Sequence, residues 1–132
     1  MLLTLCKSKL HRAVVTQAEL HYEGSIAIDA RLMETADIQP FERVQVVDIA
    51  NGARFDTYAV AGEPGSGVVC VNGAAARLVQ VGDPVIIITY AQFTPAEARA
   101  HRPRIVLLDA ENAVRETWSG DSHSIADLSE AL

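Results

Sequence analysis

The sequence predicts a mainly β protein, a small β-barrel with a few short helices. Short runs rich in Val and Ile alternate with turn residues along the chain, which is typical of many short strands. Asn51-Gly52 separates two of these runs and is a strong hairpin signal. Residues 85–90 form a nearly continuous apolar run, as in a strand that is buried on both faces.

The expected elements follow from these patterns in chain order. Strands are predicted at residues 2–7, 10–16, 25–29, 43–50, 54–61, 68–71, 85–90 and 104–108. A short helix is predicted over 29–36 with Asp29 as its N-cap. A second helix begins after Thr94, since Pro95 suits its first position and Glu97 completes a capping box.

Length and composition predict a single domain. The chain has 132 residues, enough to bury a hydrophobic core. We expect the domain to cover residues 1–117. Residues 118–132 are polar and acidic, and we expect them to form a mobile tail.

Charge and cysteine content exclude several classes of function. Eleven basic against seventeen acidic residues give a net charge of −6, which argues against a nucleic-acid partner. The two cysteines are too few for a disulfide scaffold, and no Cys or His spacing fits a metal site. No apolar run has the length of a membrane span or a signal peptide. We therefore expect a cytoplasmic protein with no metal and no membrane partner.

The run Tyr22-Glu23-Gly24-Ser25 is the most informative part of the chain. In a tight turn, Ser25 Oγ lies close to the Gly24 carbonyl carbon, which the flexible glycine backbone can expose. Attack by the hydroxyl, elimination and hydrolysis would leave a pyruvoyl group at residue 25. Its ketone can form a Schiff base with an amine substrate and accept an electron pair. A Gly-Ser pair by itself is more often a plain turn.

Two further runs have side chains or backbone suited to a binding site. Period-two alternation places Arg54, Asp56 and Tyr58 on one face of a strand and Thr57 on the other. A guanidinium there could hold a carboxylate beside a phenol that can donate a proton. A solvated arginine paired with Asp56 and a packed tyrosine are the structural alternatives. In Asn72-Gly73-Ala74-Ala75-Ala76, small side chains allow backbone N–H groups to approach a ligand, or simply allow a tight turn.

Four separated segments together resemble the bacterial aspartate 1-decarboxylase family. They are KLHRAVVTQAELHYEGSIAIDA at 9–30, NGARFDTYAV at 51–60, EPGSG at 63–67 and VNGAAARLVQVGDPVIII at 71–88. The resemblance covers roughly residues 1–110 and depends on order and spacing as well as on each motif. Arg77 and Pro64 depart from the family pattern beside the expected site.

The resemblance implies a pyruvoyl enzyme that converts L-aspartate to β-alanine and CO2 for pantothenate and coenzyme A synthesis. It implies a double-psi β-barrel, assembled as a homotetramer with sites between subunits. The precursor would cleave itself between Gly24 and Ser25 into chains 1–24 and 25–132, with a pyruvoyl group formed from Ser25. Cleavage would be spontaneous or would need a maturation factor.

The resemblance also implies roles for individual residues. Tyr58 would donate the proton to the decarboxylated intermediate. Substrate contacts would come from Lys9, Arg54, Thr57, Gly73, Ala74 and Ala75. Supporting residues would be His11 and Tyr22 near the cleavage site and Asn72, which would orient Ser25.

Two other classes of function stay open from the residues alone. Cleavage could instead free Ser25 as the nucleophile of an N-terminal serine hydrolase, which would carry a free amine at residue 25. The chain could also be an uncleaved β-barrel that binds a ligand.

Overall fold

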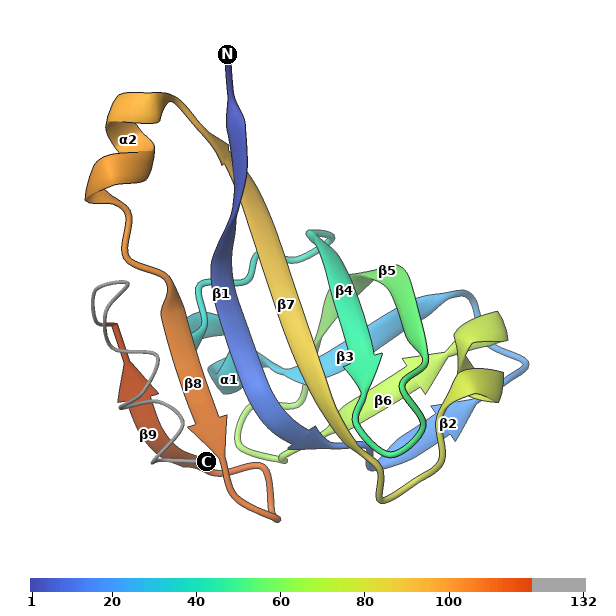
Figure 1. Cartoon of the computed structure of the whole chain (residues 1–132). Helices are drawn as coiled ribbons and strands as arrows, with labels where there is room; N and C mark the ends of the chain where they lie inside the picture. The colour runs from blue at the N-terminus through green and yellow to red at the C-terminus, as the bar shows by residue number, and fades with distance from the viewer. Residues whose placement is uncertain (120–132) are drawn as a thin grey trace.

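The computed structural model describes residues 1–119 and confirms the mainly β class (Figure 1). Nine strands of this part belong to one curved sheet. They are β1 (Leu3–Val14), β2 (Gln17–Glu19), β3 (Ser25–Asp29), β4 (Arg43–Asp48), β5 (Arg54–Gly62), β6 (Val69–Asn72), β7 (Pro84–Phe93), β8 (Arg104–Leu108) and β9 (Val114–Trp118). Three short helices join them: α1 (Ala30–Thr35), the 3-10 helix η1 (Gly73–Leu78) and α2 (Pro95–Ala100).

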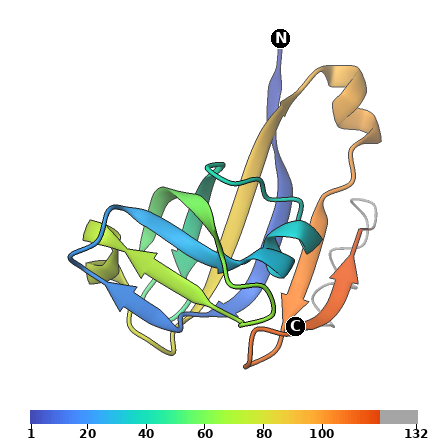
Figure 2. The ribbon, with the colours of Figure 1, turned by 180° about the vertical axis from the view of Figure 1, so that it is seen from behind.

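The strand order brings distant parts of the chain together. It runs β2-β6-β3-β5-β4-β7-β1-β8-β9, so β3 lies between β5 and β6. The β3–β5, β2–β6 and β1–β8 pairs are parallel, and the other neighbouring pairs are antiparallel. Figure 2 shows β3, β6 and β2 on the side opposite to β1 and β7.

One hydrophobic core lies inside the curve of the sheet. We call the core side of the sheet its inner face and the other side its outer face. Alternate residues of strands such as β4 and β7 enter the core, as period-two geometry requires. Fully buried core side chains include Leu10, Ile26, Ile28, Val46, Ile87 and Val106.

The predicted hairpin and helix caps are confirmed. β4 and β5 pair antiparallel around Asn51-Gly52, although β4 ends two residues early, at Asp48, whose carboxylate accepts a hydrogen bond from the Ala50 N–H. The Thr94 capping box begins α2. Asp29 caps α1.

Asp29 also holds a turn that is distant in sequence. Its carboxylate accepts hydrogen bonds from the backbone N–H groups of Arg31, Gly65 and Gly67, at 2.8, 3.0 and 2.9 Å. Burial alone would raise the pKa of Asp29, but these donors outweigh it and lower that pKa. The same carboxylate therefore joins the start of α1 to the turn before β6.

Three expectations about strands were wrong. The two strands predicted at 2–7 and 10–16 are one strand, β1, because bulges between Cys6 and Ser8 and between His11 and Ala13 absorb extra residues without ending the pairing. β2 was missed because it has only three residues. β9 was missed because all but one of its residues are exposed, and it includes Trp118 at the start of the predicted tail.

Residues 120–132 of that tail lie outside the described residues. No helix in residues 1–119 is long and apolar enough to cross a membrane.

Candidate active site

Ser25 is the first residue of β3 and is almost fully buried, with 8% of its surface exposed. In the antiparallel pairing of β3 with β6, it lies opposite Asn72. The Asn72 side-chain amide donates a hydrogen bond to Ser25 Oγ at 3.2 Å. The fold therefore holds the hydroxyl of the predicted cleavage site in one place.

Tyr58 lies on the other side of Ser25, on β5. The parallel pairing of β3 with β5 places Ile26 opposite Ala59, and both side chains are buried in the core. The preceding residues, Ser25 and Tyr58, therefore share the outer face on strands that are about 4.8 Å apart. The Tyr58 side chain is exposed, and its ring centroid lies 6.3 Å from that of Phe41.

Gly73 brings the start of η1 against the predicted cleavage site. A Cβ at this position would lie 2.7 Å from Gly24 Cα and 3.2 Å from the Tyr22 carbonyl oxygen. Gly73 also has φ of +80°, which favours glycine. Only a residue without a side chain allows the 22–24 segment to pack this closely against β6 and η1.

Tyr22 and the two alanines of η1 have different surroundings. Tyr22 is 71% exposed, beside the cleavage site. Ala74 is exposed, whereas Ala75 packs against the core. Of these three predicted contacts, Gly73 is the one that packs directly against the 22–24 segment.

The alternation predicted for β5 is confirmed. Arg54, Asp56 and Tyr58 are exposed on the outer face, and Thr57 is half-buried on the inner face, opposite Val44. The structure therefore does not bring Thr57 to the side of the sheet that carries Tyr58.

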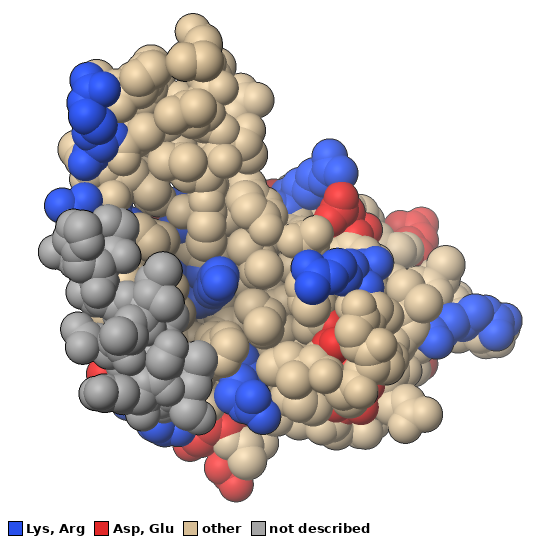
Figure 3. Space-filling view, in the orientation of Figure 1, with Lys and Arg blue, Asp and Glu red and all other residues tan. Residues whose placement is uncertain are grey.

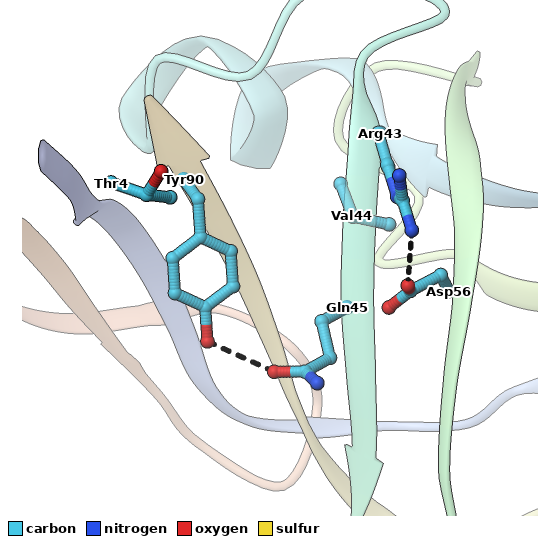
Figure 4. A pocket seen from close by; sticks show the side chains of 6 residues that line it. All are labelled: Thr4, Arg43, Val44, Gln45, Asp56 and Tyr90. Carbon is cyan, nitrogen blue, oxygen red and sulfur yellow. Dashed lines mark hydrogen bonds and ion pairs between the residues drawn. The ribbon is translucent and has the colours of Figure 1, made fainter. Parts of the chain in front are cut away.

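Asp56 pairs with Arg43 and not with Arg54. The Arg43 guanidinium lies 2.6 Å from the Asp56 carboxylate (Figure 4). Arg43 also lies directly opposite Tyr58 in the β4–β5 register. Arg54 has no hydrogen-bond or ion-pair partner among residues 1–119, so its guanidinium remains available for a carboxylate.

A hollow of about 300 Å³ lies on the outer face beside this ion pair. Figure 4 shows its lining side chains, from β1, β7, β4 and β5: Thr4, Arg43, Val44, Gln45, Asp56 and Tyr90. The Tyr90 hydroxyl donates a hydrogen bond to Gln45 at 2.9 Å across one side of it. Ser25 does not line this hollow.

Lys9 and His11 are on the outer face of β1, away from Ser25. Between β1 and β3, the strand that carries Ser25, lie β7, β4 and β5, and four strand spacings amount to about 19 Å along the sheet. Figure 3 shows this face largely free of acidic side chains over β1 and β7. Burial, then the charges of Arg12 and Lys9, lowers the pKa of His11, so its imidazole is neutral at pH 7.

Three residues around the site were not predicted from the sequence: Arg43, Phe41 and Cys70. The position of Arg43 could have been found from the register of the predicted hairpin, because that register places Arg43 opposite Tyr58. Phe41 and the buried Cys70 carried no local signal. The Cys70 thiol lies 3.3 Å from the side-chain oxygen of Asn72, and this contact depends on the conformation of β6.

Comparison with known proteins identifies the family of this chain. The family model described as aspartate decarboxylase matches residues 1–115. The chain belongs to the aspartate decarboxylase family. The match includes every residue that the sequence analysis placed at the site.

Curated relatives of this aspartate decarboxylase family member cover most of its length. Proteins named aspartate 1-decarboxylase are 57% identical in Pelotomaculum thermopropionicum, over 96% of both chains, and 59% identical in Syntrophobacter fumaroxidans, over 82% of this chain and 87% of the relative. In Clostridium beijerinckii the identity is 55%, over 93% of this chain and 99% of the relative. Similar solved structures include the rationally designed mkDPBB_sym_86 and mkDPBB_sym1 proteins. The first is 16% identical with a TM-score of 0.44, and the match covers 60% of this chain and 91% of that chain. The second is 19% identical with a TM-score of 0.43, and the match covers 67% of this chain and 100% of that chain.

Proposed function

We propose that this chain is a pyruvoyl-dependent L-aspartate 1-decarboxylase that makes β-alanine and CO2 after cleaving itself between Gly24 and Ser25. The observation that carries the proposal is the position of Ser25. Its buried hydroxyl is held by Asn72, and Gly73 packs against the Gly24 backbone on the other side of the scissile bond. Family membership supports the same reaction.

Self-cleavage needs only atoms of this chain and one water molecule. Ser25 Oγ attacks the Gly24 carbonyl carbon, the C–N bond breaks, and the amide nitrogen gains the hydroxyl proton to become an amine. Loss of the Ser25 α-proton then expels Gly24 as a carboxylate and leaves a dehydroalanine. Water adds to its imine tautomer and releases ammonia, which leaves chains 1–24 and 25–132 with a pyruvoyl group on the second chain.

The pyruvoyl ketone supplies an electron sink for decarboxylation. Its position suits the buried start of β3, where Asn72 provides a hydrogen-bond donor. Tyr58 shares the outer face with Ser25 on the neighbouring strand and carries a phenol, a group that can act as a general acid. We assign to Tyr58 the proton that replaces CO2 on the substrate α-carbon.

Selection of aspartate needs cations for its carboxylates. Arg54 is on the same face of β5 as Tyr58, and its fork of donors suits bidentate carboxylate binding. Lys9 is too far from Ser25 in one chain to share a small substrate with it. This separation supports the proposed homotetramer, in which one subunit would supply Lys9 and His11 near the Ser25 of another. Thr57, on the inner face, would need a local shift to reach the substrate.

The proposed product, β-alanine, serves pantothenate synthesis, and we place the enzyme in the cytoplasm. Cleavage is either spontaneous or assisted by a maturation factor.

The decisive experiment compares the wild-type chain with Ser25→Ala by intact mass spectrometry and by β-alanine formation from L-aspartate. We expect two wild-type chains, 1–24 and 25–132, the second lighter by one ammonia than a chain with a serine terminus. Ser25→Ala should stay intact and inactive. Cleavage of Ser25→Ala at residue 24 would contradict the proposal.

Two other results would identify the remaining classes of function. A free amine at residue 25 would indicate an N-terminal hydrolase. A wild-type chain that stays intact in extract from a bacterium that makes β-alanine would indicate an uncleaved binding protein.

A further inference from the structure

We propose that Cys70 is a positioning residue for self-cleavage, which it assists by orienting the side-chain amide of Asn72 toward Ser25. The inference rests on the proposed cleavage at Gly24–Ser25. Its structural basis is a continuous chain of side-chain contacts. Cys70 Sγ lies 3.3 Å from Asn72 Oδ1, and Asn72 Nδ2 lies 3.2 Å from Ser25 Oγ.

Strand geometry explains why these three side chains meet. Cys70 and Asn72 are two residues apart on β6 and therefore share the outer face. Ser25 lies directly opposite Asn72 on β3, so it shares that face as well. Between them, Val71 points into the core and is fully buried.

The orientation of the Asn72 amide determines how Ser25 is held. A carboxamide presents an acceptor on one side and two donors on the other, and rotation by 180° exchanges them. With the amide oriented as observed, Asn72 donates and Ser25 Oγ accepts, so the hydroxyl proton remains free to transfer to the leaving amine. With the amide reversed, Oδ1 would accept the hydroxyl proton and compete with that transfer.

The Cys70 thiol is suited to select the first orientation. A protonated thiol is a weak donor, and here it donates to Oδ1, which leaves the amide nitrogen directed at Ser25. Cys70 is buried, with 6% of its surface exposed. Burial raises the pKa of Cys70, and the nearby negative charge of Glu19 raises it further, so the thiol keeps its proton at neutral pH.

Cys6 offers a matched control in the same chain. It is the other free cysteine, half-buried on β1, and its thiol donates to the Ser8 carbonyl oxygen at 3.7 Å. It has no contact with Asn72 or Ser25. Removal of this thiol tests the general effect of losing a cysteine from the sheet.

The test is a time course of cleavage during cell-free synthesis of the full chain, read by intact mass spectrometry. We expect Cys70→Ala and Cys70→Val to slow the appearance of chain 25–132 by about tenfold, the effect of one oriented hydrogen bond near 1.4 kcal/mol. Cys70→Ser should cleave at nearly the wild-type rate, because its hydroxyl also donates to Oδ1. Cys6→Ala should have no effect.

A double-mutant comparison separates positioning from a general structural role. If Cys70 acts through Asn72, then Cys70→Ala should slow cleavage no further once Asn72→Ala is present. A purely structural role would slow both backgrounds equally. Thermal unfolding of each variant shows whether it is folded, and the Val variant fills the space if the Ala variant does not fold.

The outcomes distinguish failure of the inference from failure of the proposed function. Suppose that the wild type is cleaved. If Cys70→Val is then cleaved equally fast, or if Cys70→Ser is as slow as Cys70→Val, the role of Cys70 is overturned and the decarboxylase proposal stands. A wild-type chain that is never cleaved, even in bacterial extract, would overturn both.

Discussion

At the scale of single residues, Tyr58 differs from the other tyrosines in its neighbours. Its hydroxyl has no hydrogen-bond partner among residues 1–119, whereas that of Tyr90 is bound to Gln45. Its ring contacts Phe41, and its strand neighbour on the outer face is Ser25. A phenol in this position can donate its proton to a substrate bound at residue 25 without first breaking another hydrogen bond.

Tyr58→Phe should remove decarboxylation while leaving cleavage intact. The ring and its packing on Phe41 are kept and only the donor is lost, so we expect kcat to fall by about 10²–10⁴-fold. The measurement is β-alanine production by a preparation that mass spectrometry shows to be fully cleaved. Tyr90→Phe, on the same outer face, should have little effect on kcat. Equal activity of Tyr58→Phe and the wild type would exclude Tyr58 as the proton donor.

At the scale of elements, the contact between η1 and the 22–24 segment shapes the proposed cleavage site. η1 begins immediately after β6, and β6 pairs with β3, so its first residue necessarily faces the chain just before Ser25. Any side chain at Gly73 would displace Gly24, whose carbonyl carbon is the proposed point of attack.

Gly73→Ala should therefore slow cleavage strongly. The effect should exceed what the strain of a positive φ alone would cause, because the new Cβ also displaces Gly24. A matched control is Gly52→Ala, because Gly52 has a similar φ of +75° but nothing within 4 Å of a Cβ. Both variants should lose about 1–2 kcal/mol of stability from the left-handed conformation. Only Gly73→Ala should impair cleavage, as measured by mass spectrometry over time. Similar cleavage rates for the two variants would contradict the proposed role of the close contact.

At the scale of the whole molecule, the buried carboxyl of Asp48 and the half-buried carboxyl of Asp83 join two distant turns. Asp48, at the end of β4, is fully buried, and its Oδ2 has no hydrogen-bond partner among the described residues if both carboxyls are ionised. Asp83 lies beside it, in the turn before β7. Burial and then the proximity of Asp83 raise the pKa of Asp48, while a hydrogen bond from Asp48 lowers the pKa of Asp83. Both shifts favour a state with a proton on Asp48 and a charge on Asp83.

This proton predicts a pH-dependent stability. The pKa of Asp48 is raised in the folded state. Its contribution to the stability of the fold is therefore complete below the unfolded-state pKa of about 4, and it is lost as pH rises through the folded-state pKa. The pH dependence of the Asp83 contribution has the opposite sign, because this contribution to stability is lost as pH falls through the lowered pKa of Asp83. The pair should stabilise the fold most between these two values.

Asp48→Asn separates this effect from all other titrations. The amide can still donate to Asp83 and accept from the Ala50 N–H, but it cannot ionise. The free energy of unfolding of the wild type, relative to the variant, should fall as pH rises above about 4, by about 1.4 kcal/mol for each unit by which the pKa is raised. Chemical denaturation at several pH values measures this difference. Parallel curves for the two proteins would show that Asp48 is not protonated in the fold.

The local features of this protein were predictable from its sequence. The hairpin around Asn51-Gly52, the Asp29 and Thr94 caps and the shared face of Arg54, Asp56 and Tyr58 depend only on turn chemistry and on the period of a strand. These involve residues a few positions apart, so their geometry is determined by the backbone itself. The run ending in Gly24-Ser25, with the three other motifs, indicated the family.

Only the tertiary structure decided which of these local features come together. The order β6-β3-β5 places Ser25 between Asn72 and Tyr58, although these residues are 47 and 33 positions away along the chain. The tertiary structure also decided that Asp56 pairs with Arg43 and that the Cys70 thiol contacts Asn72. It places Lys9 away from Ser25 in the strand order. The physical reason is that strand order and register follow from the burial of all the inner faces in one core, a property of the entire chain that no local pattern contains.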